Sequence, residues 1–381
     1  MKQVYLDHNA TTPVHPEILE RISGWAKEWG NPSSVHQASR EPKALIREAR
    51  KALAEYFKVH PLELIFTSCG SESNNEAIKG VFYALKDQGK NHFITSSVEH
   101  PSILKTFEFL QSQGAVVDYI PVDKNANLDL DFYKSKLSDK TALVSVMLAN
   151  NETGAIHPIK EMCVLAHQKG ALFHTDAVQA LGKMDVDLED LGVDLASFSG
   201  HKFYSLRGVG LLFQKRGTTM VPLIAGGGQE RGRRAGTENT LAISAIGHMI
   251  TKEDLIRTEN ERIRGLRDQM EQKIMESIEG VCIFQNPHRV PYTSSLFIEG
   301  VDGETLLMNL DMHGICVSTG AACSSGSQEP SAVLRAMGYT RKEAQSSLRV
   351  SLGWGNNAEQ IEYFLETLKK VVLRIRQFNK Q

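Results

Sequence analysis

The sequence lacks the features that direct a protein into a membrane or onto a nucleic acid. No apolar run approaches the length that crosses a bilayer, and the first residues contain no signal-peptide apolar core. The 43 basic and 45 acidic residues give a formal charge of -2, and no basic run is sustained. This balance argues against nucleic acid or a membrane surface as the main partner. We therefore expect a protein of the cytoplasm.

Cysteine is also scarce, with five residues and no close pair. An odd number without Cys-Xaa-Xaa-Cys spacing excludes a disulfide framework and a zinc site of the usual kind, so no metal is expected. Cys69 precedes a predicted phosphate loop. Cys323 is different, because residues 318–327 around it are small or polar and predict an exposed, flexible loop. The others lie among apolar neighbours and are predicted to be small core residues: Cys163, Cys282 and Cys316.

The pattern of apolar runs predicts an α/β fold. A chain of 381 residues with 41% hydrophobic residues is too long for one core, so we expect two domains. Short apolar runs alternate with helix-length segments, which predicts a mostly parallel sheet with helices on both faces. The runs are residues 63–67, 93–96, 116–121, 143–148, 171–175, 195–199 and 209–213.

A smaller α+β domain is predicted to follow this sheet. It begins with a charged helix over residues 255–278 and continues with strands over 293–298 and 348–352 and a last helix over 358–378. We predict a large domain of residues 13–254 and a small domain of residues 1–12 and 255–381. The small domain carries the Cys323 loop.

Polar residues with chemical potential follow the predicted strands. Ligands of open α/β sheets bind beyond the carboxyl ends of the strands, so one crevice is expected to collect these side chains. They are Ser71, His100, Asn151, Asp176 and Lys202.

Lys202 and Asp176 form the most informative pair. Each follows an apolar run, and Lys202 has Ser199 and His201 beside it. Pyridoxal 5'-phosphate needs a lysine that holds its aldehyde and an acid that faces its pyridinium nitrogen. A single lysine after a strand is most often a solvated surface cation. The matching carboxylate favours the cofactor.

A phosphate site and a stacking residue are predicted nearby. Residues 68–73 turn from a strand into a helix, which offers free backbone N–H groups and a hydroxyl to a phosphate. An ordinary serine cap without a ligand is the alternative. Ser199 and His201 are further candidates for phosphate contacts. His100 is either a satisfied loop histidine or a ring that stacks on the cofactor and moves protons.

Short motifs along nearly the whole chain share one order and spacing with a known family. They include Tyr5-Leu6-Asp7, Ala10-Thr11-Thr12-Pro13, Gly30-Asn31-Pro32-Ser33-Ser34, Asn150-Asn151-Glu152-Thr153-Gly154, and residues 66–68, 99–100, 174–179, 197–202, 227–232, 236–237 and 329–331. The chain resembles the cysteine desulfurases of the NifS/IscS type, class V aminotransferases with the fold type I of pyridoxal-phosphate enzymes. The length of the Cys323 loop resembles the iron-sulfur and nitrogen-fixation group.

The resemblance implies roles around the cofactor. Lys202 holds the aldehyde, Asp176 pairs with the pyridinium nitrogen, and His100 stacks on the ring. Gln179 and Asn151 address the side of the ring hydroxyl. The phosphate is held by Gly70, Ser71, Ser199 and His201, with Thr237 contributed by the second subunit of a homodimer.

The resemblance also implies the reaction. Arg349, with Asn151 nearby, binds the carboxylate of L-cysteine through paired hydrogen bonds; the alternative for Arg349 is a structural ion pair. The Cys323 thiolate takes the sulfur as a persulfide and alanine leaves, with His100 as an acceptor for the thiol proton. The sulfur then passes to an acceptor or scaffold protein for iron-sulfur cluster assembly or tRNA thiolation.

Two rival functions remain at this stage. One is a selenocysteine lyase or another lyase or aminotransferase of the same fold, which would not need the mobile thiol of Cys323. The other is a non-catalytic scaffold that retains the fold. One departure from the family is a turn in which Ser205 and Leu206 replace Gly-Pro, and this change predicts a looser turn after Lys202.

Overall fold

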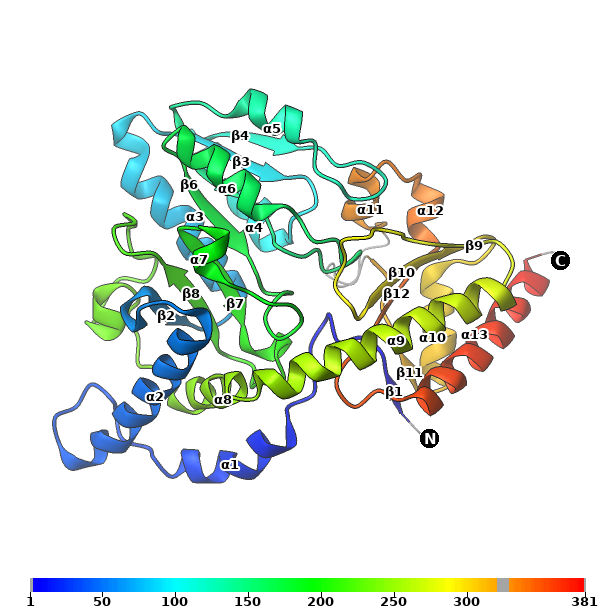
Figure 1. Ribbon diagram of the computed structural model, residues 1–381, viewed down its shortest axis with the longest axis horizontal. Coiled ribbons are helices and arrows are strands. Elements are labelled where there is room, and N and C mark those ends of the chain that lie inside the picture. The colour runs from blue at the N-terminus through cyan, green and yellow to red at the C-terminus, as the bar shows by residue number, and fades with distance from the viewer. Residues whose placement is uncertain (1–2, 321–328, 380–381) are drawn as a thin grey trace.

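The centre of the protein is a seven-stranded sheet (Figure 1). The computed structural model describes residues 3–320 and 329–379. The strand order is β2-β8-β7-β6-β5-β3-β4, and neighbours are parallel except that β8 is antiparallel to both β2 and β7. The strands are β2 (Leu64–Thr67), β3 (His92–Ser96), β4 (Val116–Ile120), β5 (Thr141–Ser145), β6 (Leu172–Asp176), β7 (Leu195–Ser199) and β8 (Gly210–Gln214).

Each face of this sheet has its own hydrophobic core. Successive side chains of a strand point to opposite faces, so Leu143 packs on one side and Val144 on the other. Both neighbours are apolar because helices cover both faces, as in most parallel sheets. The helices of one face are α3 (Gly70–Leu85) and α4 (Pro101–Ser112). Those of the other are α1 (Pro16–Ala26), α2 (Arg40–Phe57), α5 (Leu130–Lys136), α6 (Ile159–Gln168), α7 (Leu188–Leu191) and α8 (Thr240–Ile250).

A second group of elements lies beside the large sheet (Figure 1). Its antiparallel sheet has the order β12-β10-β9, and a two-stranded sheet pairs β1 with β11 in parallel. The strands are β1 (Val4–Tyr5), β9 (Val281–Ile283), β10 (Thr293–Ile298), β11 (Ile315–Cys316) and β12 (Ser347–Ser351). The helices are α9 (Glu253–Ser277), α10 (Gly303–Met312), α11 (Ala332–Ala336), α12 (Arg341–Gln345) and α13 (Ala358–Phe378).

The predicted fold class is confirmed, and most predicted strands differ from the observed ones by one or two residues. The strand predicted over 143–148 is the exception, since β5 ends at Ser145. Val146 and Leu148 still donate backbone hydrogen bonds to the carbonyls of His174 and Asp176, so the chain stays extended along β6. The division into two domains stays a prediction. Val4 and Leu6 belong to the hydrophobic cluster of α9 and α13.

The N-terminal segment links the two groups of elements. Leu6 N–H donates to the carbonyl of Cys316 (2.8 Å), and Thr12 N–H donates to the carbonyl of His201 (2.9 Å). Residues between these contacts therefore run from the small sheet to the carboxyl ends of the large one. This path brings the start of the chain beside Lys202.

The prediction that Cys282 is a core residue is wrong. Cys163 is buried and Cys316 is partly buried, but Cys282 is exposed. It lies in the middle of the edge strand β9, where Ile283 faces the core and the neighbouring side chain points to solvent. Apolar neighbours in sequence thus did not imply burial.

Within residues 3–320 and 329–379 we find no helix with the length and apolarity needed to cross a membrane.

Candidate active site

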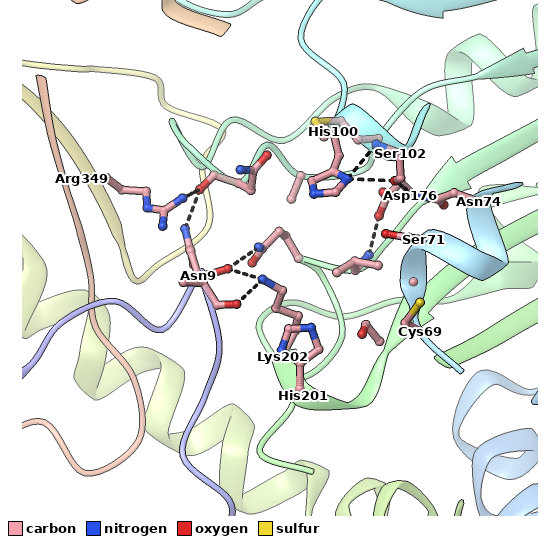
Figure 2. Close-up of a pocket in the computed structure, with 18 residues that line it drawn as sticks. Asn9, Cys69, Ser71, Asn74, His100, Ser102, Asp176, His201, Lys202 and Arg349 are labelled. Carbon is pink, nitrogen blue, oxygen red and sulfur yellow. Dashed lines mark hydrogen bonds between the residues drawn. The ribbon is translucent and has the colours of Figure 1, made fainter. Parts of the chain in front are cut away.

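The predicted site residues come together in one cavity of about 310 Å³. It lies at the carboxyl ends of β6 and β7, between the large sheet and the N-terminal segment (Figure 2). Thr237 lines a different hollow, and Cys323 lies outside the described residues. The residues that the sequence predicted and that line this cavity are Gly70, Ser71, His100, Asn151, Asp176, Gln179, Ser199, His201, Lys202 and Arg349.

Lys202 is held by the N-terminal segment. It ends a short 3₁₀ turn, η4 (Gly200–Lys202), directly after β7. Its Nζ donates to the carbonyl oxygens of Asn9 and Ala10, each at 2.6 Å (Figure 2). Sequence reasoning missed these two partners, although they adjoin the motif Ala10-Thr11-Thr12-Pro13. Two backbone acceptors fix the position of the amine.

The turn after Lys202 accommodates its unusual sequence. Ser205 does not have a positive φ, so a glycine is not required there; the left-handed residue is Tyr204, with φ 54°. Tyr204 N–H donates to Thr12 Oγ1 (2.8 Å), and its hydroxyl accepts from Trp354 N–H (2.8 Å). These contacts hold the turn that the sequence predicted to be looser.

Asp176 ends β6 and is buried. Its Oδ1 accepts from Val178 N–H (3.0 Å), and its Oδ2 accepts from Asn74 Nδ2 (2.7 Å). Asn74 also donates to Ser102 Oγ (2.9 Å). Asn74 and Ser102 were not predicted, and both lie in helices that begin at the cavity. The carboxylate is therefore fixed from both of its oxygens.

The other end of the cavity fits a phosphate group. The helix α3 begins at Gly70 without a side-chain cap, so its first N–H groups face the cavity. Ser199 Oγ is buried and has no hydrogen-bond partner among the described residues. Burial lowers the pKa of His201 to about 4, so the ring is neutral. A Cβ at Gly70 would lie 2.8 Å from Val178 Cγ2, so a larger residue there would have to displace the Val178 side chain.

Gln179 is oriented by a buried lysine that the sequence did not reveal. Its Nε2 donates to the carbonyl of Asn9 (3.0 Å), and its Oε1 accepts from Lys183 Nζ (2.7 Å). Lys183 lies over the ring of Tyr292, 4.6 Å from its centroid, and burial lowers the pKa of Lys183 well below its usual value. The Lys183 contact determines which end of the amide faces Asn9.

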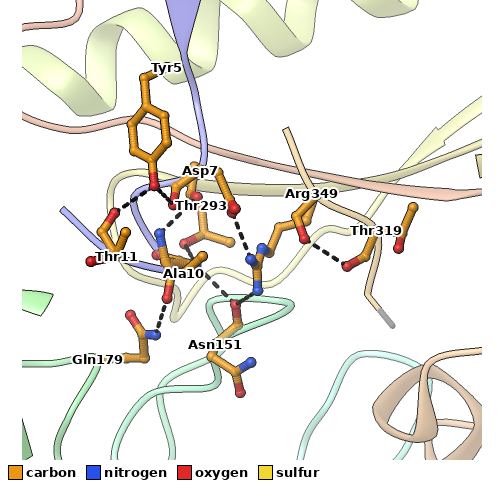
Figure 3. Close-up of polar contacts among 12 residues, drawn as sticks. Tyr5, Asp7, Ala10, Thr11, Asn151, Gln179, Thr293, Thr319 and Arg349 are labelled. Carbon is orange, nitrogen blue, oxygen red and sulfur yellow. Dashed lines mark hydrogen bonds and ion pairs between the residues drawn. The ribbon is translucent and has the colours of Figure 1, made fainter. Parts of the chain in front are cut away.

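Arg349 makes a buried ion pair and also lines the cavity (Figure 3). Its Nη2 lies 2.7 Å from Asp7 Oδ1, and its Nη1 donates to the carbonyl of Asn151 (3.0 Å). Its buried Nε has no partner among the described residues. Sequence reasoning did not pair it with Asp7, 342 positions away. The two contacts hold the guanidinium in one orientation.

A buried carboxyl group adjoins Asn151. Glu152 accepts a hydrogen bond of 2.5 Å from Ser331 Oγ, and burial raises its pKa from 4.5 to about 7 despite the opposing effects of Ser331 and Arg349. A raised pKa in the folded state means that the group contributes stability below about pH 4.5 and that this contribution disappears as the pH rises through 7.

We predict that Glu152→Gln removes part of the pH dependence of folding. Between pH 5 and pH 8 the wild-type protein will lose stability relative to the variant, on the order of 2 kcal/mol. Urea unfolding at both pH values measures the change, with the exposed Glu261→Gln on α9 as the control. Parallel pH profiles for the wild type and Glu152→Gln would contradict the prediction.

Comparison with known proteins points to one family. The profile of the family described as aminotransferase class-V matches residues 4–364. The chain is 44% identical to "Cysteine desulfurase IscS" of Clostridium botulinum, over 99% of this chain and 96% of that protein. It is 41% identical to "Cysteine desulfurase NifS" of Azotobacter vinelandii, over 99% and 94%.

Solved structures agree. One described as "NIFS-LIKE PROTEIN" superposes with a TM-score of 0.92 at 35% identity, covering 98% of this chain and all of that one. A second, described as "SspA in complex with cysteine", has a TM-score of 0.81 at 31% identity, covering 92% and 99%.

Proposed function

Since the chain belongs to the aminotransferase class-V family, as a pyridoxal-phosphate-dependent cysteine desulfurase of the IscS/NifS type, we propose specific roles for its residues. The observation that carries the proposal is the presence of Lys202 and Asp176 in one cavity, together with the uncapped start of α3 and the unpartnered hydroxyl of Ser199. Bound there, the cofactor supplies an electron sink for negative charge at the substrate Cα.

Lys202 and Asp176 are proposed to act at different atoms of the cofactor and substrate. Asp176 would pair with the pyridinium nitrogen of the bound cofactor, and its charge would keep that nitrogen protonated. Lys202 would hold the aldehyde carbon, and its free Nζ would take the α-proton of the substrate. The carbonyls of Asn9 and Ala10 support this role because they keep Nζ at the cavity wall between the two steps.

Arg349 binds the carboxylate of cysteine. Its ion pair with Asp7 and its bond to Asn151 support the proposal, because a guanidinium with a fixed plane loses little freedom when it accepts a second anion. Asn151 and Gln179 address the hydroxyl side of the ring.

Cys323 is the proposed sulfur acceptor within the enzyme. Its thiolate forms a sulfur–sulfur bond with the substrate, and the carbon–sulfur bond breaks toward the carbon. Protonation of that carbon and return of a proton from Lys202 to Cα then yield alanine. The persulfide sulfur then passes to an acceptor or scaffold protein in the cytoplasm, for iron-sulfur cluster assembly or tRNA thiolation.

Incubation with L-cysteine and a thiol reductant tests the function. We expect alanine and sulfide in equal amounts and a visible absorbance band of bound cofactor. A requirement for a keto acid would favour an aminotransferase, strong preference for selenocysteine would favour a selenocysteine lyase, and absence of the band would favour a non-catalytic scaffold.

Asp176→Ala tests the pyridinium contact. Loss of the carboxylate will slow alanine formation by about a hundredfold or more, because one preorganised charge at the reacting group is removed. The visible spectrum will change as well, since the ring nitrogen loses its proton. An unaltered spectrum with an unaltered rate would place the required carboxylate elsewhere.

We also propose that the enzyme is a homodimer. Thr237 is exposed and lies outside the cavity of its own chain, which fits a role in the partner's phosphate site. The loop before it exposes an apolar cluster suited to contact with a second copy: Val221, Leu223 and Ile224.

Thr237→Ala will therefore weaken cofactor binding without altering the chain's own cavity. Cofactor occupancy, measured by absorbance, will fall when the protein is diluted. The variant will begin to lose cofactor at a higher protein concentration than the wild type. A stable monomer by light scattering that keeps full occupancy would exclude the shared site.

A further inference from the structure

A chain of hydrogen bonds joins Asp176 to His100. Asn74 Nδ2 donates to Asp176 Oδ2 (2.7 Å) and to Ser102 Oγ (2.9 Å). Ser102 Oγ lies 2.8 Å from His100 Nδ1 (Figure 2). All four of these residues line the cavity, so the chain of hydrogen bonds connects Asp176 and His100 along its wall.

The carboxylate sets the direction of the first two hydrogen bonds in this chain. An ionised carboxylate only accepts hydrogen bonds, so the amide nitrogen of Asn74, and not its oxygen, faces Asp176. The second hydrogen of that nitrogen then goes to Ser102 Oγ. This oxygen accepts from Asn74 and keeps its own hydrogen, which it can donate to a lone pair on His100 Nδ1.

The helix α4 imposes the same state on His100 independently. His100 is the N-cap residue of α4, and its Nδ1 accepts from the backbone N–H of Ser102 (3.1 Å). The positive end of the helix disfavours a cationic ring. Burial lowers the pKa of His100, Lys202 lowers it further, and Asp176 opposes this effect.

We propose that Asp176, acting through the positioning residues Asn74 and Ser102, fixes His100 as a neutral ring that carries its proton on Nε2. Nε2 is the nitrogen left for the cavity, since Nδ1 is occupied by Ser102. His100 is then a hydrogen-bond donor to the bound molecules in the resting enzyme. In this state Nε2 does not accept the thiol proton of Cys323, the role expected for His100 from the sequence.

The role of this N–H in turnover rests on the proposed function, whereas the tautomer is a property of the protein alone.

Another histidine of the same protein provides a control. His60 caps a turn in the same way, with its Nδ1 accepting from Leu62 N–H (3.1 Å), but a leucine there provides no hydroxyl. His60 is exposed and lies outside the cavity.

Nuclear magnetic resonance of the ¹⁵N-histidine-labelled protein, with and without cofactor, tests the proposal. Two-bond proton–nitrogen correlations distinguish the two neutral tautomers and the cation, and His100→Gln assigns the signal. We expect a neutral Nε2–H ring for His100 from pH 6 to pH 8 in both forms. A proton on Nδ1, or a cationic ring at pH 7, would overturn the proposal.

Substitutions of Ser102 and Asn74 test the contribution of each residue to the state of His100. Ser102→Ala will raise the protonation midpoint of His100 by about one pH unit, because one donor to Nδ1 is lost, while Ser102→Thr restores the wild-type midpoint. Asn74→Ala will shift it in the same direction by less. The protonation midpoint of His60 will not change in any variant. An unchanged protonation midpoint of His100 in both Ser102→Ala and Asn74→Ala would refute a role for this chain of hydrogen bonds.

The readout does not depend on turnover. A His100 ring that is not the Nε2–H tautomer, in a protein that still produces alanine, would refute this inference but not the proposed function. The expected tautomer in a protein that produces no alanine from cysteine would leave it standing and refute the proposed function.

Discussion

Lys202→Ala will reduce alanine formation from cysteine by about 10⁴-fold or more. Lys202 has two roles, to hold the cofactor aldehyde and to move the α-proton. General acid–base catalysis alone accounts for a rate enhancement of as much as about 10⁴-fold. The neighbouring buried lysine, Lys183, does not replace it, because its Nζ is engaged by Gln179. The carbonyl of Ala10 will lose its Lys202 donor, whereas that of Asn9 will keep the hydrogen bond from Gln179 Nε2.

A stoichiometric alanine assay measures this loss, and cofactor absorbance shows whether the phosphate pocket still binds. Lys58→Ala is the matched control, since Lys58 is exposed and pairs with Asp187 outside the cavity. It will keep wild-type turnover. Near-normal turnover of Lys202→Ala would refute the assignment of Lys202.

Cys323→Ser will separate cysteine binding from sulfur transfer. Lys202 keeps its hydrogen bonds to Asn9 and Ala10, and Asp176 keeps its bond to Asn74. The variant will therefore still bind the cofactor, and its visible absorbance will still change when cysteine is added. Persulfide formation will be lost, because a hydroxyl at neutral pH is a far poorer nucleophile than a thiolate. Mass spectrometry after brief exposure to cysteine will find added sulfur on the Cys323 peptide of the wild type only.

The other cysteines provide the controls for that experiment. Cys282→Ser, at an exposed position, will keep full activity. Cys163→Ala will also keep activity while losing stability, because Cys163 is buried against the main sheet. Sulfur that maps reproducibly to Cys69 or Cys316 would overturn the choice of nucleophile.

The main sheet and the residues that follow its strands could be predicted from the sequence alone. Buried parallel strands read as short apolar runs, and the polar residues after them share one edge of the sheet by topology alone. Lys202, Asp176 and His100 were identified in this way. The family was recognised from short motifs whose order and spacing can be read directly from the sequence. Its membership is confirmed by the comparisons.

How these side chains are held depends on contacts that form only when the chain has folded. The carbonyls beside Lys202, the pairing of Arg349 with Asp7 and the link from Asp176 to His100 join segments far apart in sequence. No periodicity encodes such contacts, because they depend on where the N-terminal segment crosses the large sheet and on which helices begin at its edge. The exposure of Cys282 has the same origin, since a strand's position at a sheet edge is set by packing and not by its neighbours in sequence.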